Sequence, residues 1–282
     1  MPSVVIENGL RLEYGSVGDG FPLLLIAGLG RDRGMWSAQI DALSSQYRVV
    51  TFDNRGVGGS DRPSGPYTIA HMADDAAQLL DALDIARAHV LGASLGGMIA
   101  QELERRNPER VATLTLLCTT PGLPLAIGMS PSVYASIQPN ANGDPLQTLT
   151  GAMRLAHSNW YWELNEEHLK EAARRRLADP IAPQSWWTQA AAGAGFSSLP
   201  RAPQVPCLVM TGEDDLIVPP VNSERLAARI TDVRLERYLG GGHYFFVEEP
   251  DAVNGAILEF LAPHTPGSHI AGNSGRGERN HP

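Results

Sequence analysis

"VLGASLGGMIAQEL", residues 90–103, joins an apolar run to a helical pattern through a cluster of small residues. The run 88–93 is typical of a strand that is buried on both faces, and 95–105 has the apolar spacing of a helix. Gly92, Ser94 and Gly96 fit the pattern G-x-S-x-G, in which a serine stands on a sharp turn between strand and helix. Ser94 is therefore predicted to be a nucleophile, although a tight turn of small residues would produce the same pattern.

The chain on both sides of this turn alternates strand and helix patterns. A hairpin around Asn8-Gly9 comes first. Strands are then predicted at 21–27, 47–52, 88–93, 111–118, 205–211 and 233–238, with helices at 35–43, 69–83, 95–105, 222–230 and 252–261. Repeated β–α units predict a parallel sheet with helices on both faces. Between about 121 and 198 no strand pattern is evident, which indicates an inserted helical layer.

Candidate partners for Ser94 follow two of the predicted strands. A serine of ordinary pKa needs a general base, and the base needs an acid to orient it. Three adjacent carboxylates, Glu213, Asp214 and Asp215, follow one strand, and His243 stands among glycines after the next. The carboxyl ends of parallel strands share the sheet edge that carries ligand sites, so we expect these groups to meet there.

These motifs resemble the α/β-hydrolase superfamily, and within it the branch of lidded serine esterases and enol-lactonases. The likeness rests also on "TFDNRGVGGSDRP" at 51–63 and "GGGHYFFVEEP" at 240–250, and it covers residues 1 to about 262. The resemblance implies an α/β-hydrolase fold with a mostly parallel sheet of about eight strands and a helical cap after the sixth. It divides the chain into a core of 1–118 and 199–262, a cap of 119–198 and a disordered tail of 263–282.

The resemblance also favours one of the three acids. In the family the acid lies three residues after a glycine and four before a proline, and Asp215 has this spacing from Gly212 and Pro219. Whether Asp214 could replace Asp215 stays open at this point. An aspartate nucleophile, which related dehalogenases and epoxide hydrolases use, is disfavoured by the serine at 94.

Two backbone N–H groups are expected to form an oxyanion hole. Leu95 follows the serine at a helix N-terminus, where developing negative charge is stabilised. The family's second donor lies in a His-Gly-x loop, which corresponds here to Ala27-Gly28-Leu29. The N–H of Leu29 can serve because the donor is main chain, but Ala27 removes the scaffolding that the family's histidine supplies.

The predicted function is hydrolysis of a carboxylic ester or lactone through an acyl-enzyme. Ser94 attacks the carbonyl, His243 carries the proton, and Asp215 orients the histidine. The same fold and triad could instead serve carbon–carbon bond hydrolysis or cofactor-free perhydrolysis, because a fold does not fix the reaction. Aromatic side chains in the inserted layer predict an apolar substrate pocket, or else rings that pin the layer to the core: Trp160, Trp186 and Trp187.

A remote alternative is a nicotinamide-dependent oxidoreductase. Gly28, Gly30 and Gly34 follow a predicted strand, and Asp53 ends the next one, as in a dinucleotide-binding fingerprint. This alternative leaves the ordered serine, acid and histidine loops without a purpose. We therefore expect no cofactor.

Composition narrows the partners. A formal charge of −9 over 282 residues predicts no binding to nucleic acid or to an anionic membrane. Cys118 and Cys207 lie in apolar runs, so packing is expected rather than a disulfide or a metal site. No secretory signal or stretch of about 18 apolar residues is evident, which favours a cytoplasmic enzyme for a small-molecule substrate. The oligomeric state stays open.

Overall fold

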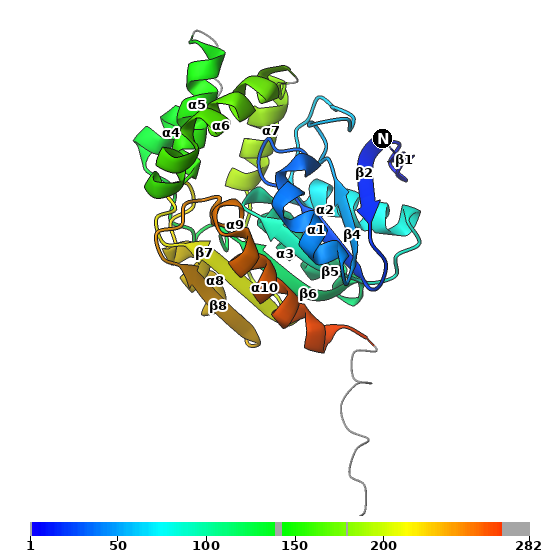
Figure 1. Ribbon diagram of the computed structural model, residues 1–282. Coiled ribbons are helices and arrows are strands. Elements are labelled where there is room, and N and C mark those ends of the chain that lie inside the picture. Colours follow the sequence, from blue (N-terminus) through cyan, green and yellow to red (C-terminus); the bar gives the residue numbers. More distant parts are fainter. Residues whose placement is uncertain (1, 139–142, 179, 267–282) are drawn as a thin grey trace, which may run out of the picture.

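The computed structural model describes residues 2–138, 143–178 and 180–266, and these contain one eight-stranded sheet (Figure 1). The strand order is β1-β2-β4-β3-β5-β6-β7-β8, with β2 antiparallel to its two neighbours and all other pairs parallel. The strands are β1 (Ser3–Val5), β2 (Arg11–Val17), β3 (Pro22–Ile26), β4 (Arg48–Phe52), β5 (Ala88–Ala93), β6 (Val111–Leu117), β7 (Cys207–Gly212) and β8 (Val233–Tyr238). The predicted mostly parallel sheet with a leading hairpin is confirmed.

Helices cover both faces of the sheet because alternate strand residues point to opposite sides. Leu24 and Ile26 of β3 belong to a core shared with α2, α3 and α8, whereas Leu23 and Leu25 belong to a core shared with α1 and α10. These helices are α1 (Ser37–Ser44), α2 (Ile69–Ala82), α3 (Leu95–Arg106), α8 (Val221–Ala227), α9 (Phe245–Glu248) and α10 (Pro250–Leu261), with 3-10 turns η1 (Arg33–Trp36) and η2 (Pro108–Arg110).

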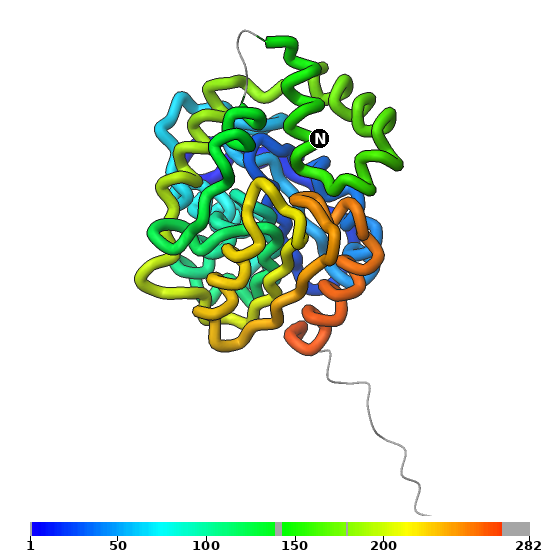
Figure 2. Tube along the Cα trace, turned by 90° about the vertical axis from the view of Figure 1, so that its left-hand side faces the viewer, coloured from blue at the N-terminus to red at the C-terminus, as the bar shows by residue number. Residues whose placement is uncertain are grey.

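Four helices lie between β6 and β7 among the described residues: α4 (Pro131–Ile137), α5 (Pro145–Ala156), α6 (Asn159–Ala178) and α7 (Pro183–Ala194). We call residues 119–198 the helical segment. Figures 1 and 2 show it over one end of the sheet. α4 and α5 begin with a polar N-cap, Ser130 or Asp144, followed by proline at the first helical position, a strong signal for starting a helix.

The described C-terminal end packs against the sheet edge opposite the helical segment. η3 (Ala262–His264) ends in Thr265, whose Oγ1 lies 3.2 Å from the Tyr47 hydroxyl and 3.1 Å from His89 Nε2. The first residues assigned to the tail, 263–266, are therefore in contact with the core, and the rest of that prediction, 267–282, lies outside the described residues. In the described part of the chain no helix is long and apolar enough to span a membrane.

Candidate active site

Ser94 stands at the corner between β5 and α3 with φ 54° and ψ −118°. A non-glycine residue with such a backbone costs of order 1–3 kcal/mol, which the surrounding packing must offset. The flanking glycines permit that packing. A Cβ on Gly92 would lie 2.3 Å from the Gly96 carbonyl oxygen, and a Cβ on Gly96 would lie 2.0 Å from the Ile26 carbonyl oxygen. The G-x-S-x-G pattern thus reflects close backbone contacts around a strained, partly exposed serine.

His243 and Asp215 form a buried pair on the loops after β8 and β7. His243 Nδ1 lies 2.7 Å from Asp215 Oδ2, and the residues are 5% and 3% exposed. The other carboxylate oxygen, Oδ1, accepts hydrogen bonds from the N–H groups of Ile217 at 2.8 Å and Val218 at 2.9 Å. A carboxylate held by two backbone donors has one orientation, so it fixes the plane of the imidazole.

The electrostatics of this pair favour a charged histidine. Burial lowers the pKa of His243, but the negative charge of Asp215 outweighs burial and raises that pKa well above 6.5. With Nδ1 bonded to the carboxylate, Nε2 is the ring nitrogen left to accept a proton. The neighbouring acids Glu213 and Asp214 are exposed, and only Asp215 of the three contacts His243.

The turn after β3 presents the expected oxyanion donors. In the described part of the chain, the N–H groups of Leu29 and Leu95 donate no hydrogen bond, and Leu95 is the first residue of α3. The neighbouring Gly30 N–H is occupied, because it donates to Gln189 Oε1 at 2.9 Å. Asn54 Nδ2 donates to the Ala27 carbonyl at 3.0 Å, so an asparagine supports the turn where the family's histidine is missing.

A buried carboxylate that sequence reasoning missed organises the histidine loop. Glu248 accepts hydrogen bonds from Gly242 N–H at 3.0 Å and Ser158 N–H at 2.7 Å, and burial raises its pKa. The N–H of Tyr244 donates to the Ala156 carbonyl at 3.0 Å. The loop that carries His243 is therefore tied to the start of α6. The acidic residue five positions after His243 was the only sequence signal for this role.

Cys118 lies behind the pair. One ligand atom from each of Cys118, Asp215 and His243 lies within 4.8 Å of the others, and all three residues are buried. Among the described residues this is the one such cluster that could share a metal ion, but its histidine nitrogen already bonds the carboxylate. Burial raises the pKa of the Cys118 thiol, which keeps the sulfur neutral. These observations fit the predicted packing role.

The three predicted tryptophans differ in position. Trp186 is 8% exposed and packs on the oxyanion turn, since a Cβ on Gly30 would lie 3.1 Å from its Cδ1. Trp187 and Trp160 are about two-fifths exposed, at 39% and 41%. Trp160 Nε1 donates to the Gly240 carbonyl at 3.2 Å, which joins the helical segment to the core. Trp186 is thus the tryptophan beside the site.

Asp53 has a structural position that excludes the dinucleotide alternative. It is 1% exposed, and its carboxylate accepts hydrogen bonds from the Arg33 backbone at 2.8 Å, the Arg33 guanidinium at 2.6 Å and the Gly59 N–H at 2.9 Å. A carboxylate that is buried and fully bonded cannot bind a ribose. The interpretation of Gly28, Gly30, Gly34 and Asp53 as a dinucleotide-binding site is wrong, because these residues build the oxyanion turn and its support.

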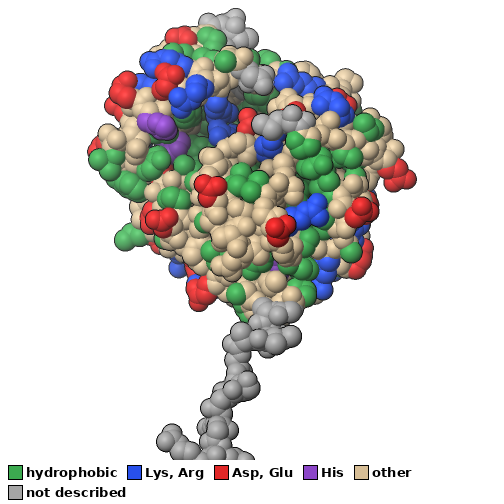
Figure 3. Space-filling view, turned by 45° about the vertical axis from the view of Figure 1, so that its right-hand side comes forward, with side chains coloured by type: hydrophobic (Ala, Val, Ile, Leu, Met, Phe, Trp, Pro, Cys, Tyr) green, Lys and Arg blue, Asp and Glu red, His purple; other side chains and the backbone are tan. Residues whose placement is uncertain are grey.

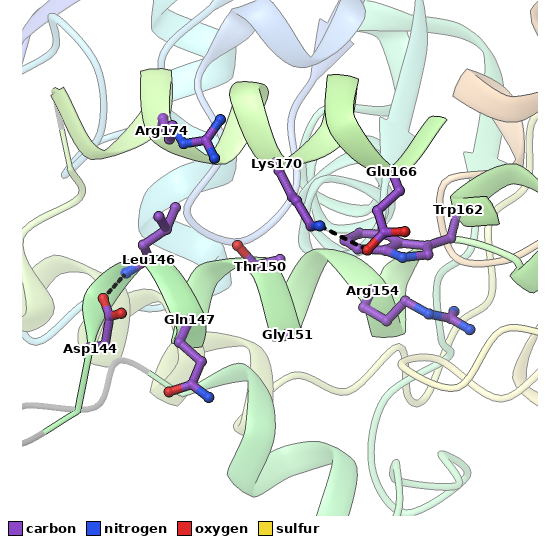
Figure 4. A pocket seen from close by; sticks show the side chains of 10 residues that line it. All are labelled: Asp144, Leu146, Gln147, Thr150, Gly151, Arg154, Trp162, Glu166, Lys170 and Arg174. Carbon is purple, nitrogen blue, oxygen red and sulfur yellow. Dashed lines mark hydrogen bonds and ion pairs between the residues drawn. The ribbon is translucent and has the colours of Figure 1, made fainter. Parts of the chain in front are cut away.

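A groove of about 760 Å³ lies between α5 and α6 (Figure 4). It is polar and charged: the figure shows Lys170 paired with Glu166, whose Oε1 is 2.9 Å from the ammonium nitrogen, near Trp162 and Arg154. None of its ten lining residues belongs to the corner, the His243 loop or the oxyanion turn. This groove is therefore separate from the site built around Ser94.

A doubly covered sheet with a serine on a strained strand-to-helix corner, and a histidine–aspartate pair at the same edge, defines the class of α/β hydrolases. The family described as "alpha/beta hydrolase fold" matches residues 22–250, and this chain belongs to it. The predicted fold class and superfamily are therefore confirmed.

Several relatives share most of the chain. "Putative carbamate hydrolase RutD" from Azorhizobium caulinodans is 32% identical over 263 residues, 88% of this chain and 94% of that protein. "Poly(3-hydroxyalkanoate) depolymerase" from Ectopseudomonas oleovorans is 30% identical over 242 residues, 85% of this chain and 84% of that protein. The crystal structure of an enol-lactonase from Burkholderia xenovorans LB400 has a TM-score of 0.81 and 28% identity, and covers 92% of this chain and 99% of its own.

Proposed function

We propose that this chain is a serine hydrolase that cleaves a carboxylic ester or lactone, with Ser94 as nucleophile, His243 as general base and Asp215 as the orienting acid. The observation that carries the proposal is the His243–Asp215 hydrogen bond of 2.7 Å at the sheet edge where Ser94 adopts φ 54°. Strained nucleophile, base and acid occur in the order expected for this fold.

In the first half of the reaction Ser94 Oγ attacks the substrate carbonyl while His243 Nε2 takes its proton. The imidazolium that forms is stabilised by Asp215, which keeps its own charge. The carbonyl oxygen becomes an oxyanion, which the N–H groups of Leu29 and Leu95 bind. In a well-studied protease one such donor contributes about 3 to 4 kcal/mol to the transition state.

In the second half His243 returns the proton to the departing alcohol, and the acyl group stays on Ser94. Water then attacks the acyl-enzyme with His243 again as the base, and the carboxylic acid leaves. In a lactone the alcohol and the acid belong to one molecule, so a single hydroxy acid is released. Neither half needs a cofactor.

The division of the chain follows the same proposal. Residues 1–118 and 199–262 would form the catalytic core, and residues 119–198 a cap that covers the sheet edge. Trp186 is the best placed of the three tryptophans to contact substrate, because it packs on the oxyanion turn. Trp160 and Trp187 are more exposed, and Trp160 joins the cap to the core through Gly240.

The relatives support acyl chemistry but differ in the bond. The names printed for them refer to a carbamate, a polyester and an enol-lactone, and all three bonds join a carbonyl to a heteroatom. An oxygen ester or lactone is the common choice for the latter two. Carbon–carbon hydrolysis and perhydrolysis would use the same three residues, so the test must include substrates of these kinds.

The test is hydrolysis of p-nitrophenyl esters of increasing acyl length, lactones, a vinylogous 1,5-diketone and perhydrolysis of acetate. Wild type and Ser94→Ala are purified in parallel, with Ser223→Ala as the control. Ser223 is buried in α8, and its hydroxyl makes no hydrogen bond within the described residues. We expect ester or lactone turnover that falls by at least about 10⁴-fold in Ser94→Ala. Turnover retained in Ser94→Ala would contradict the proposal.

A further inference from the structure

A second hollow, of about 150 Å³, adjoins the proposed catalytic groups. Liquid water occupies about 30 Å³ per molecule, so this hollow has room for a small polar group. Arg31 lines it from two residues beyond Leu29, and Tyr244 lines it from the position after His243. The remaining lining comes mainly from α5 and α6: Met35, Met153, His157, Tyr161, His168, Leu169, Ala172 and Val247.

Arg31 has no carboxylate partner in the described part of the chain. Its guanidinium carbon lies 5.5 Å from the centroid of the Tyr244 ring, and it forms no ion pair there. Other partly buried arginines are paired: Arg33 Nη1 lies 2.6 Å from Asp53, and Arg55 bonds Asp75. Since a buried cation is costly without an anion, Arg31 leaves a place for one.

A second guanidinium approaches from the helical segment. His168, Ala172 and Arg176 are spaced four residues apart on α6, so Arg176 shares the helix face whose residues line the hollow. It is partly buried and forms no ion pair among the described residues, whereas Arg175 pairs with Glu171 on the outer face. Burial lowers the pKa of Arg176 to about 10, and repulsion from Arg31 adds to that effect.

The groups around the two arginines leave a positive balance. Burial lowers the pKa of His157 to about 4, so this ring is neutral at pH 7. The nearest acids are otherwise engaged: Glu248 bonds two backbone N–H groups, and exposed Asp32 caps the Gly34 N–H at 2.8 Å. Burial would raise the pKa of the Tyr244 hydroxyl, but the charges of Arg31 and Arg176 lower it. In Figure 3, Arg and Lys side chains gather around a hollow with histidine on its rim.

We propose that Arg31 and Arg176 bind a carboxylate carried by the acyl part of the substrate. This inference rests on the proposed function, since it places the carboxylate relative to the carbonyl that Ser94 attacks. A planar guanidinium matches a carboxylate with two parallel hydrogen bonds. Two residues of backbone span at most about 7 Å between Leu29 and Arg31, so only a few carbon atoms separate the two groups. The substrate class is a monoester or lactone of a short dicarboxylic acid.

The first experiment compares monoethyl adipate, which carries a free carboxylate, with ethyl heptanoate, which does not. We expect wild type to prefer monoethyl adipate in kcat/KM, and Arg31→Met or Arg176→Met to lower this preference about ten- to hundredfold, as for loss of a charge-assisted hydrogen bond. Arg175→Met is the matched control, because Arg175 is 59% exposed on the other face of α6, and its preference should equal that of wild type. Equal losses for both esters in Arg31→Met would overturn the proposal.

A binding measurement separates this inference from the proposed reaction. Calorimetric titration of Ser94→Ala with adipate should show binding that weakens at least about tenfold when Arg31→Met is added. Arg31→Lys keeps the charge and guards against a folding defect, so it should lose less. Adipate binding without ester turnover in wild type would sink the reaction and leave the carboxylate site standing. Ester turnover without adipate binding and without a preference would sink the carboxylate site alone.

Discussion

α3 in the core and α6 in the helical segment differ in how much of each is buried. α3 has twelve residues, of which nine are buried, whereas α6 has twenty residues and only three are buried. α4 has no buried residue. The helical segment contributes a separate apolar cluster of four buried residues, compared with the large clusters on both faces of the sheet.

This contrast separates two tasks. The core holds Ser94, Asp215 and His243 by close backbone packing and by hydrogen bonds that leave little freedom. The helical segment has few apolar contacts per residue, so its helices are expected to open at a lower free energy than the core. Changes in the core should therefore alter the rate or the fold, and changes in the helical segment should alter which substrate is accepted.

Asp215→Asn tests the core side of the comparison at its largest effect. An amide would leave the geometry intact but favour the wrong histidine tautomer, and kcat for ester hydrolysis should fall by about 10⁴-fold. Asp214→Asn is the matched control, because Asp214 is exposed and does not contact His243. Its kcat should stay within about twofold, the usual result for an exposed site. A large loss in Asp214→Asn instead would show that the wrong acid has been chosen.

Glycine-to-alanine changes test packing in the two regions. Gly96→Ala places a Cβ 2.0 Å from the Ile26 carbonyl oxygen and should lower the free energy of unfolding by about 3 kcal/mol. Gly151→Ala in α5 meets no atom within 4 Å and should raise it by about 0.5–1 kcal/mol, because alanine is the better helix former. Urea unfolding measures both. Similar losses at the two positions would contradict the difference in packing.

The pH profile tests the charge balance at His243. The ring must be neutral to accept the serine proton, and Asp215 raises its pKa above 6.5, so kcat/KM should rise with pH through a midpoint above 6.5. Each unit below that midpoint should reduce kcat/KM about tenfold. In Asp215→Asn burial acts alone, and NMR titration of the imidazole should show a midpoint that has moved to lower pH. An unchanged midpoint would mean that the carboxylate does not set it.

Two adjacent tryptophans test the helical segment at its smallest effect. Trp186→Ala removes a ring that packs on the oxyanion turn, whereas Trp187→Ala removes a ring that is 39% exposed. We expect the acyl-length preference to shift about tenfold in the first variant and within about twofold in the second, in line with the few kcal/mol that a pocket contact contributes. Competition between short and long p-nitrophenyl esters gives the ratio. A loss of melting temperature in Trp186→Ala with unchanged preference would indicate packing alone.

The core could be predicted because its signals are local. Continuous apolar runs mark strands covered on both faces, and the small residues around Ser94 mark the corner. The order of serine, acid and histidine then follows the strand order. The choice among Glu213, Asp214 and Asp215 did not follow from strand order, because burial separates neighbours only once the loop has turned; the spacing to Gly212 and Pro219 supplied the missing step.

The supports of the site were harder to predict because they come from distant parts of the chain. Gln189 bonds Gly30 across 159 residues, and Glu248 bonds Ser158 across 90. The segment between 119 and 198 could be predicted as helical, but its weak apolar patterning did not indicate which side chains face the core. The facing arginines and the position of Trp186 depend on that packing.

The buried carboxylate of Glu248 restricts how the molecule can admit a substrate. It holds Ser158 and Gly242 together, and the Tyr244–Ala156 bond reinforces the join. Lifting the start of α6 would break three backbone hydrogen bonds and carry His243 out of place. The start of α6 is therefore a hinge point rather than a door. Substrate passage falls to the opposite end of the segment, at α4, and widening it there leaves the catalytic histidine undisturbed.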